Sequence, residues 1–347
     1  MTADRHSNQA GRLSATVVIC AYTEERWDDI VLAVESACHQ DYPARDVVVV
    51  VDHNADLLAR CKRRFPVVKV IANLESTGLA GARNTGVAYA DTDVIAFLDD
   101  DAEAAPDWLG RLMQPYGDPD VLGVGGRVEP AWSGKRPRSM PPEFYWVVGC
   151  SYVGLPPATA AVRNLIGANM SLRRSVFADV GGFAAGLGRV RSRPAGCEET
   201  ELCIRARARH ENGRFVYEPS AVVRHRVTPE RQSWRYFRDR CFAEGRSKAV
   251  VASLVGSGPA LASEWDYVRH ALPHGVARGF REAMAGDATG AVRAGRIIAG
   301  LSITTAGYLA GSLAASRLRT GRPAVAPVLA SGALFTAGTH AVTEETS

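Results

Sequence analysis

Three consecutive aspartates, Asp99, Asp100 and Asp101, directly follow the apolar run of residues 94–98. A short run of apolar and β-branched residues predicts a buried strand. Open α/β sheets bind ligands beyond the carboxyl ends of their strands, and aspartate oxygens suit hard cations. The triplet therefore predicts a Mn²⁺ or Mg²⁺ site that also holds the phosphates of a ligand. A solvated acidic turn is the alternative interpretation.

Alternating strands and helices in the first third of the chain would position this triplet. The predicted strands are residues 16–21, 47–51, 67–72 and 94–98, and the predicted helices are residues 30–37, 56–64 and 79–90. This alternation predicts parallel βαβ units. A nicotinamide or flavin enzyme is not favoured, because the glycines at 123, 125 and 126 lack the third glycine of the dinucleotide fingerprint and open no helix.

The next hundred residues predict a more mixed set of elements. They are a helix over 106–116, strands over 121–128 and 167–172, and helices from Arg174 and over 198–210. Residues 130–161, rich in Pro, Trp and Tyr, predict an irregular loop, and residues 181–196 predict a mobile loop able to fold over a substrate. Glu198, Glu199 and Glu201 fall in the first turn of the last helix, where the macrodipole favours negative charge.

Composition limits the class of protein. The chain has 347 residues and a net charge of +4, and its basic clusters come with no nucleic-acid-binding module, so no nucleic acid partner is expected. The seven cysteines form no Cys-x-x-Cys pair, which is typical of a reduced, intracellular protein without zinc or disulfides. Residues 1–15 are polar and contain no signal-peptide pattern, so we expect the catalytic part to be cytoplasmic.

The last hundred residues differ in character from the rest. We predict a flexible N-terminus over 1–14, a catalytic domain over 15–250 and a helical C-terminal region over 251–347. Residues 265–281 carry an apolar stripe flanked by basic residues, which suits an anionic membrane surface, although Pro273 and Gly275 interrupt it. Residues 297–316 carry no charge and form a candidate membrane helix. A small-residue helix packed on the catalytic domain is the alternative.

Several short motifs, in this order, resemble those of the family 2 inverting glycosyltransferases. They lie at residues 16–26, 47–52, 78–86, 97–108, 167–174, 181–183, 198–202 and 222–225. The resemblance covers about residues 14–250. It implies an α/β protein of the GT-A type, with a Rossmann-like mixed sheet flanked by helices. It also implies a nucleotide-activated sugar as the donor substrate.

The resemblance assigns the donor-binding residues. Ala21, Tyr22 and Glu24, together with Asp52, would hold the base and the ribose. A tyrosine can stack on a pyrimidine and a carboxylate can accept its N3 proton, so a UDP-sugar is the expected donor. Arg83 would lie near the nucleotide, where its guanidinium can bind phosphate or ribose oxygens. In the alternative interpretation Tyr22 packs in the core and Asp52 caps a helix.

The same resemblance assigns the metal ligands. Asp101 would ligate the metal directly, with Asp99 on the ribose side and Asp100 near the donor sugar. His225 matches a histidine that adds a metal or diphosphate contact in many relatives, although a lone histidine is also often structural. The metal would neutralise the departing diphosphate.

One-step inversion needs a base beside the acceptor hydroxyl, on the face opposite the leaving diphosphate. Relatives carry Glu-Asp at the start of the helix, with the second residue as the base, which corresponds to Glu199. This chain has Glu-Glu instead, one methylene longer, so Glu198 and Glu199 both remain candidates. Complementing the helix dipole is the alternative role, and it suits Glu201 better than Glu199.

The resulting expectation is an inverting, metal-dependent glycosyltransferase of the hexosyltransferase class. It would act on a hydroxyl of a glycan or lipid-linked acceptor at the cytoplasmic face of the cell membrane. Residues 232–248, which alternate aromatics with arginines, would close over the site or meet the membrane, or would simply pack as a helix. The competing hypotheses are a polyprenyl-phosphate sugar synthase of the same fold and a non-catalytic nucleotide-sugar binding protein.

Overall fold

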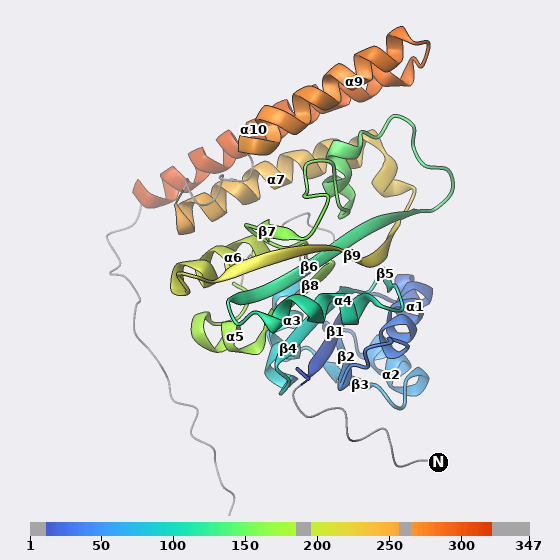
Figure 1. Cartoon of the computed structure of the whole chain (residues 1–347), viewed down its shortest axis with the longest axis vertical. Helices are drawn as coiled ribbons and strands as arrows, with labels where there is room; N and C mark the ends of the chain where they lie inside the picture. The colour runs from blue at the N-terminus through green and yellow to red at the C-terminus, as the bar shows by residue number, and fades with distance from the viewer. Residues whose placement is uncertain (1–11, 185–195, 257–264, 321–347) are drawn as a thin grey trace, which may run out of the picture.

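The computed structural model describes residues 12–184, 196–256 and 265–320 (Figure 1). Its centre is one mixed sheet in the order β3-β2-β1-β4-β8-β6-β9-β5, with β7 added on β9. The strands are β1 Ala15–Ala21, β2 Asp46–Val51, β3 Lys69–Ala72, β4 Val94–Asp99, β5 Ala102–Ala104, β6 Val121–Trp132, β7 Ala160–Val162, β8 Asn169–Arg173 and β9 Arg214–Val227. The predicted GT-A type α/β architecture is confirmed.

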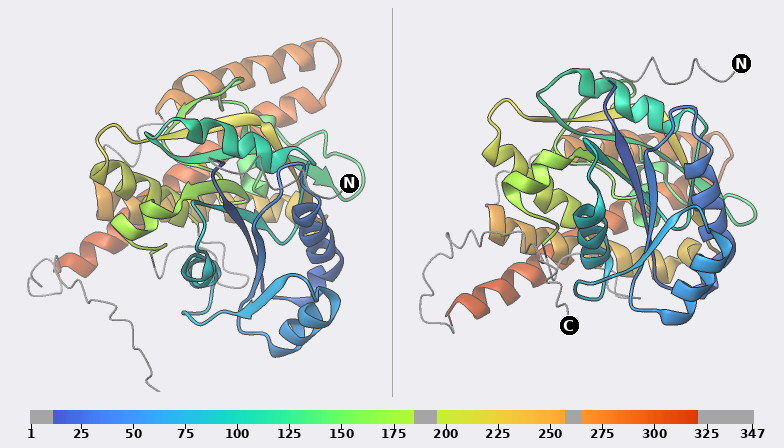
Figure 2. Two further views of the ribbon diagram at one scale, coloured as in Figure 1. Left: turned by 60° about the horizontal axis from the view of Figure 1, so that its bottom comes forward. Right: turned by 90° about the horizontal axis from the view of Figure 1, so that it is seen from below.

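Helices flank the sheet on both sides, as Figure 2 shows from two further directions. Those of the sheet layer are α1 Trp27–Cys38, α2 Ala55–Arg64, α3 Leu79–Tyr89, α4 Trp108–Met113, α5 Arg174–Val180 and α6 Glu198–Arg209. Alternate side chains of β1 point to opposite faces. Val17 and Ile19 pack with the core residues of α1 and α2, whereas Val18 packs with those of α3, α5 and α6.

The first four predicted strands are confirmed and are mutually parallel. β1 pairs with β2 and with β4, and β2 pairs with β3. Val17 and Ile19 have no exposed surface, as expected for a parallel sheet covered on both faces. The triplet at the carboxyl end of β4 therefore lies at the same edge as the ends of β1 and β2.

The second half of the sheet brings distant residues to that edge. β8 runs antiparallel to β4 and β6, and β9 runs parallel to β6. The far end of β9 then pairs antiparallel with β5, where His225 lies opposite Ala102. The backbone N–H of Arg226 donates to the carbonyl of Asp101 at 2.8 Å. This pairing places His225 beside the triplet.

The prediction of an irregular loop over 130–161 is wrong in part. β6 continues to Trp132, a 3-10 helix η3 forms over Pro142–Val148, and β7 adds to the sheet at Ala160–Val162. The sequence pattern misses η3 because its two prolines suggest a loop, yet Pro141 and Pro142 lie at a helix start, where a missing N–H costs nothing. The predicted helix over 106–116 is α4 followed by the 3-10 turn η2, Gln114–Gly117. Most of the loop predicted over 181–196 lies outside the described residues.

Helices from the C-terminal part form a separate layer. They are α7 Trp234–Val255, the π-helical turn η5 Tyr267–Ala271, α9 Leu272–Met284 and α10 Thr289–Thr320. The predicted interruption at Pro273 and Gly275 is wrong in part, because residues 265–284 are helical without a break. The π-helical turn η5 stands directly before Pro273, and such a turn is a usual way for a helix to accommodate a local irregularity. The boundary predicted at residue 250 falls inside α7.

Glycines let α10 lie against the backbone of α7. A Cβ on Gly245 would overlap the carbonyl oxygen of Thr304, and a Cβ on Gly307 would overlap the carbonyl oxygen of Phe242. A Cβ on Gly311 would come within 2.8 Å of Ala249. The glycine pair at 307 and 311 therefore faces α7 within the same chain.

We predict that Gly307→Ala destabilises the protein by about 1–3 kcal/mol, because the added methyl group has no room between α7 and α10. Gly295→Ala in the same helix is the matched control, since a Cβ there meets nothing within 4 Å. It should be neutral or stabilising by up to about 1 kcal/mol. Denaturant unfolding measures both, and equal effects at the two positions would contradict the packing of α10 on α7.

Candidate active site

Asp99, Asp101 and His225 form a cluster with metal-ligand geometry. One oxygen of each carboxylate and one ring nitrogen of the histidine all lie within 4.8 Å of one another. Asp99 is the last residue of β4 and is partly exposed, whereas Asp101 and His225 are buried. Two carboxylates and an imidazole are donors that fit Mn²⁺ or Mg²⁺, with the imidazole better suited to Mn²⁺.

Three basic groups surround the Asp101 carboxylate. His225 Nε2 lies 3.1 Å from Oδ1, and Arg26 Nη1 and Arg231 Nη2 each lie 3.1 Å from Oδ2. Burial alone would raise the pKa of Asp101, but His225 and the two guanidinium groups hold it well below its usual range. Burial would lower the pKa of His225, yet the charge and hydrogen bond of Asp101 raise it to about 10. Asp101 is therefore an ionised carboxylate inside the protein.

Asp100 is also buried but is held differently. Its Oδ1 accepts from Arg26 Nη1 at 2.6 Å, while its Oδ2 has no hydrogen-bond partner within the described part of the chain. Burial raises the pKa of Asp100 to about 7, and the neighbouring Asp101 and Asp99 add to this against the effect of Arg26. A buried oxygen without a protein partner, next to three candidate ligands, suits the binding of a cation or of a polar ligand group.

Arg26 and Arg231 were not predicted as site residues. Arg26 ends the 3-10 turn η1, Glu24–Arg26, directly after β1, and Arg231 lies in the 3-10 turn η4, Glu230–Gln232, which follows β9. Arg26 is the last residue of the motif at 16–26, and Arg231 stands six residues after the motif at 222–225, but neither was assigned a role from the sequence. Their positive charges balance the triplet and are placed where an anionic ligand would meet them.

We predict that Arg231→Leu lowers the stability of the metal-free protein by about 3–5 kcal/mol, because it removes one partner of a buried ion pair and leaves Asp101 less compensated. Added Mn²⁺ should raise the melting temperature more in this variant than in the wild type, because the metal restores the lost positive charge. Arg226→Leu, which breaks the more exposed pair with Asp29, should cost less than about 1 kcal/mol. An equal response of all three proteins to Mn²⁺ would be evidence against this electrostatic role.

Arg83 connects the triplet to the acidic pair that begins α6. Its guanidinium is buried, with Nη1 at 3.0 Å from Glu198 Oε1 and Nη2 at 3.5 Å from Asp99 Oδ1. Nη2 also donates to the carbonyl of Gly167 at 3.0 Å. The ring of Phe183 lies 5.4 Å away and covers the guanidinium. The sequence placed Arg83 near the donor, but its contact with Glu198 is visible only in the fold.

Glu198 and Glu199 have different surroundings. Glu198 is almost fully buried against Arg83, and its Oε2 has no hydrogen-bond partner among the described residues. Glu199 is partly exposed and forms no ion pair with any residue that the structure describes. Burial and then the charge of Glu198 raise the pKa of Glu199 well above its usual range, despite the opposing effect of Arg83. Cys197, the residue before α6, has a φ of 74°, a strained conformation of the kind that clusters at functional sites.

Glu201 has a structural role. Its carboxylate binds Arg205 one turn later, at 2.8 Å, and the same guanidinium donates to the carbonyl of Gly182 at 2.9 Å. This network joins α6 to the segment after α5. The alternative interpretation, in which the acidic first turn of α6 stabilises the structure, therefore accounts for Glu201.

The predicted donor-binding residues lie around the carboxyl ends of β1 and β2. Ala21 is the buried last residue of β1, and its carbonyl accepts from the backbone N–H of Asp52 at 2.8 Å. The Asp52 carboxylate accepts from Asn73 Nδ2 at 2.6 Å and from the backbone N–H of Gly78 at 2.9 Å. Asp52 thus holds the start of α3, while Asn54 caps α2.

Tyr22 and Glu24 continue from the end of β1. The Arg26 guanidinium lies 5.2 Å from the ring centre of Tyr22, which connects this ring to the cations around the triplet. Glu24 is more exposed, and its carboxylate lies 3.9 Å from Arg60 on α2. The carboxylate of Glu24 therefore faces α2, at the outer border of the site.

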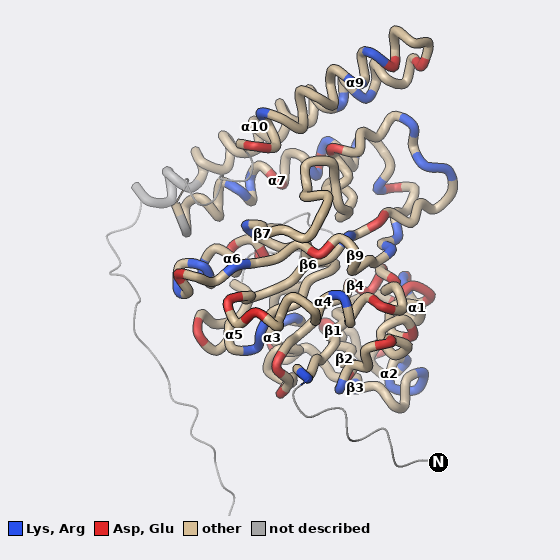
Figure 3. The backbone as a smooth tube through the Cα atoms, in the orientation of Figure 1, with Lys and Arg blue, Asp and Glu red and all other residues tan. Residues whose placement is uncertain are grey.

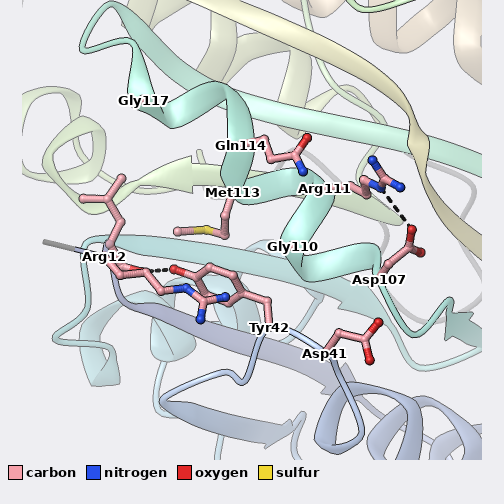
Figure 4. A pocket seen from close by; sticks show the side chains of 10 residues that line it. Arg12, Asp41, Tyr42, Asp107, Gly110, Arg111, Met113, Gln114 and Gly117 are labelled. Atoms are coloured by element: carbon pink, nitrogen blue, oxygen red, sulfur yellow. Dashed lines mark hydrogen bonds and ion pairs between the residues drawn. The ribbon is translucent and has the colours of Figure 1, made fainter. Parts of the chain in front are cut away.

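A shallow pocket of about 600 Å³ lies away from the triplet, beside the amino end of β1 (Figure 4). Arg12, Tyr42 and residues of α4 line it. Two of its basic groups contact other lining residues, since Arg111 donates to Asp107 at 3.0 Å and the Arg12 guanidinium stacks on Tyr42 at 3.3 Å. None of the predicted site residues lines this pocket, so we assign it no part in the chemistry.

Comparisons with known proteins agree with this arrangement. Residues 16–181 match the family described as Glycosyl transferase family 2. A glucosyl-dolichyl phosphate glucuronosyltransferase of Haloferax volcanii is 35% identical over 246 residues, which are 70% of this chain and 78% of that protein.

Two solved structures share the fold. The mannosyltransferase PcManGT of Pyrobaculum calidifontis, in complex with GDP-Man and Mn²⁺, is 22% identical and superposes with a TM-score of 0.56, over 90% of this chain and 88% of that one. GalNAc-T7 with UDP, GalNAc and Mn²⁺ gives a TM-score of 0.51 at 20% identity, over 67% of this chain. The chain covers 48%, about half, of the length of GalNAc-T7.

Proposed function

We propose, on the premise that this chain belongs to glycosyltransferase family 2, that it transfers a sugar from a nucleotide-diphosphate donor to a hydroxyl group with inversion. The observation that carries the proposal is the buried bridge from Asp99 through Arg83 to Glu198. It joins the candidate metal ligands at the end of β4 to the acidic pair at the start of α6. A displacement at a sugar carbon needs these two functions on opposite sides of one reacting centre.

The donor side follows from the basic and acidic groups around Asp101. Asp99, Asp101 and His225 would hold Mn²⁺ or Mg²⁺, which supplies charge neutralisation for the departing diphosphate. Arg26 and Arg231 would exchange their contacts with Asp101 for contacts with the diphosphate oxygens. Guanidinium groups suit this exchange because they bind carboxylate and phosphate in the same two-pronged geometry.

The acceptor side depends on the two glutamates that begin α6. Glu199 is the proposed base, because it pairs with no cation among the described residues and its raised pKa brings it closer to the operating pH. Glu198 is the proposed positioning residue, since its pairing with Arg83 keeps the guanidinium beside the triplet. The different partners of Glu198 and Glu199 support this assignment of the two candidates.

The acceptor class follows from the relative in Haloferax volcanii. That protein is a glucosyl-dolichyl phosphate glucuronosyltransferase, so its acceptor is a sugar attached to a lipid phosphate. We propose a lipid-linked sugar hydroxyl as the acceptor here also, with residues 15–250 forming the catalytic part on the cytoplasmic side of the membrane. A UDP-sugar is the proposed donor, because the Tyr22 ring can stack on uracil and the Asp52 carboxylate can accept a hydrogen bond from the N3–H group of uracil.

A panel of nucleotide sugars tests the donor assignment. Only the right donor, together with Mn²⁺ or Mg²⁺, should raise the melting temperature, because a ligand at about 100 times its Kd stabilises a protein by about 2.7 kcal/mol. We expect a response to one or more UDP-sugars, with UDP-glucuronic acid in the panel beside UDP-glucose, GDP-mannose and dTDP-glucose. Mass analysis of a polyprenyl-phosphate-linked sugar incubated with the stabilising donor then tests transfer. A panel without any metal-dependent shift would count against the donor site.

A further inference from the structure

The outer face of α9 is apolar although it is exposed. Pro273, Ala277, Phe280 and Met284 recur at helical spacing along one stripe, and Phe280 and Met284 are 51% and 81% exposed. Leu272, Gly275 and Gly279, on the opposite side, are buried. Aromatic and thioether side chains of this size, placed side by side on a helix surface, indicate a surface that is covered in the working protein.

The outer face of α10 continues this pattern. Its inward side is lined by small residues, including Gly307 and Gly311, that pack on α7. Large apolar side chains stand on its outward side and are 49–62% exposed. They are Val292, Ile298, Leu309 and Leu313. Figure 1 shows α9 and α10 as the outermost layer, beyond α7 and far from β3.

Basic residues border the apolar surface of this hairpin. Arg281 of α9 follows Phe280 directly, and Arg269 of η5 stands one turn before Pro273; both are exposed. His270 of η5 pairs instead with Asp266 at 2.8 Å. The Arg269 guanidinium stacks on Trp265 at 5.1 Å, and Trp265 is itself 59% exposed. Arg281 forms no ion pair among the residues that the structure describes, and Figure 3 shows the positive groups that gather along α9. An apolar stripe beside a basic one matches the surface of an anionic lipid bilayer.

We propose that the outer faces of α9 and α10 dock on an anionic lipid surface, with α10 lying along the interface and not crossing it. By length and apolar composition, residues 289–314 of α10 could cross a membrane. Crossing would separate α10 from α7, however, and would expose the contacts of Gly245 and Gly307 that fit only when the two backbones touch. The intramolecular packing therefore uses one face of α10 and leaves the other face for lipid.

The docking layer is attached to the wall of the active site. Arg278 of α9 binds the buried carboxylate of Glu143 in η3 at 2.9 Å. Gly149 directly follows η3 and lies against His225, since a Cβ on this glycine would come within 3.2 Å of the imidazole ring. The Arg296 guanidinium of α10 lies 5.7 Å from the ring centre of Trp234, three residues after Arg231. Membrane docking would thus hold the site near the lipid surface, a benefit that rests on the proposed lipid-linked acceptor.

Vesicle flotation of the full chain tests this proposal. We expect binding to vesicles of phosphatidylcholine with phosphatidylglycerol, weaker binding to phosphatidylcholine alone, and release by high salt or alkaline carbonate. The double variant Phe280→Ser, Met284→Ser should bind about tenfold or more weakly, since two large apolar side chains are lost from the interface. The matched control is Val67→Ser, Leu74→Ser, because these residues are 93% and 87% exposed on the opposite side of the molecule.

A second variant keeps the test independent of the first. Arg269→Glu, Arg281→Glu should also reduce flotation and remove its salt dependence. The proposal is overturned by a lack of flotation with either vesicle, by binding that resists carbonate, or by unchanged binding of both hairpin variants. A dimer in solution that Phe280→Ser, Met284→Ser disrupts, without vesicle binding, would assign the face to a second copy instead. The donor-induced thermal shift should persist in every variant, so a failed docking surface is distinguishable from a failed donor site.

Discussion

Replacing Glu199 by glutamine is expected to lower kcat for transfer to a hydroxyl acceptor by about 10²–10⁴-fold, the usual contribution of a general base. Glutamine keeps the size of the side chain but cannot accept the acceptor proton. Donor binding should be unchanged, because Glu199 belongs to the acidic pair and not to the cluster around Asp101. Initial rates of sugar transfer and the donor-induced thermal shift measure the two effects separately.

The pH profile gives a second, independent measure of this base. Only the ionised carboxylate accepts a proton, so kcat should rise with pH as Glu199 loses its own proton. Burial and the charge of Glu198 raise the pKa of Glu199, which moves this acidic limb above the range of an ordinary glutamate. The limb should disappear in Glu199→Gln. A profile that is flat through this range would argue that another group takes the proton.

Two controls distinguish the base from its neighbours and from the rival chemistry. Glu201→Gln, in the same helix turn, should retain transfer activity, because the Glu201 carboxylate is engaged by Arg205 of the same helix. A polyprenyl-phosphate sugar synthase would need no strong base, since its acceptor is already an anion. Nearly full activity of Glu199→Gln with a polyprenyl phosphate as acceptor would therefore favour the synthase over the hydroxyl transferase.

Replacing Asp101 by asparagine is expected to abolish metal-dependent donor binding. It should also slow transfer about 10²–10⁴-fold, which corresponds to an activation barrier raised by several kcal/mol. Asp101 is the carboxylate on which His225, Arg26 and Arg231 converge. The expected result is a melting curve that no longer responds to nucleotide sugar with Mn²⁺. Thermal shift and isothermal calorimetry measure this without any need for catalytic turnover.

The stability of Asp101→Asn needs its own control. Loss of the buried carboxylate removes the acidic partner of Arg231, while Arg26 keeps its pair with Asp100, and this should cost about 3–5 kcal/mol in the metal-free protein. Asp99→Asn is the milder comparison, because Asp99 is 29% exposed and its ion pair within the described part of the chain is the longer one with Arg83, at 3.5 Å. A folded Asp99→Asn protein that still binds Mn²⁺ and donor as the wild type does would exclude Asp99 as a ligand.

The strand order explains why local motifs were sufficient for the first half of the fold. Residues 16–21 and 94–98 are continuous apolar runs that end in polar residues, and parallel strands bring such ends to one edge. The position of the triplet relative to Ala21 and Asp52 could therefore be predicted without a structure. The region from 130 to 161 could not, because its prolines and aromatics form η3 only when α9 and α10 pack on it.

The C-terminal helices show the opposite case. The uncharged run and the glycines at 307 and 311 suited either a membrane helix or a helix packed on the protein. Composition is the same for both, since small residues permit close contact with any partner helix. The packing on α7 is decided by the complementary glycine at 245, sixty-two residues earlier in the chain, which no local pattern connects to Gly307.

By itself the sequence determined the class of fold, the edge of the sheet that carries the chemistry, and the carboxylates of the two parts of the site, which are the aspartate triplet and the acidic pair. Those features depend on runs of neighbouring residues, which have fixed periodicity and fixed spacing. Only the tertiary structure decided how the charges pair, with Arg83 bridging Asp99 to Glu198 and Arg231 reaching Asp101. Such pairings depend on the register of β9 and on the direction in which α6 begins, and both are set by contacts between segments far apart in the chain.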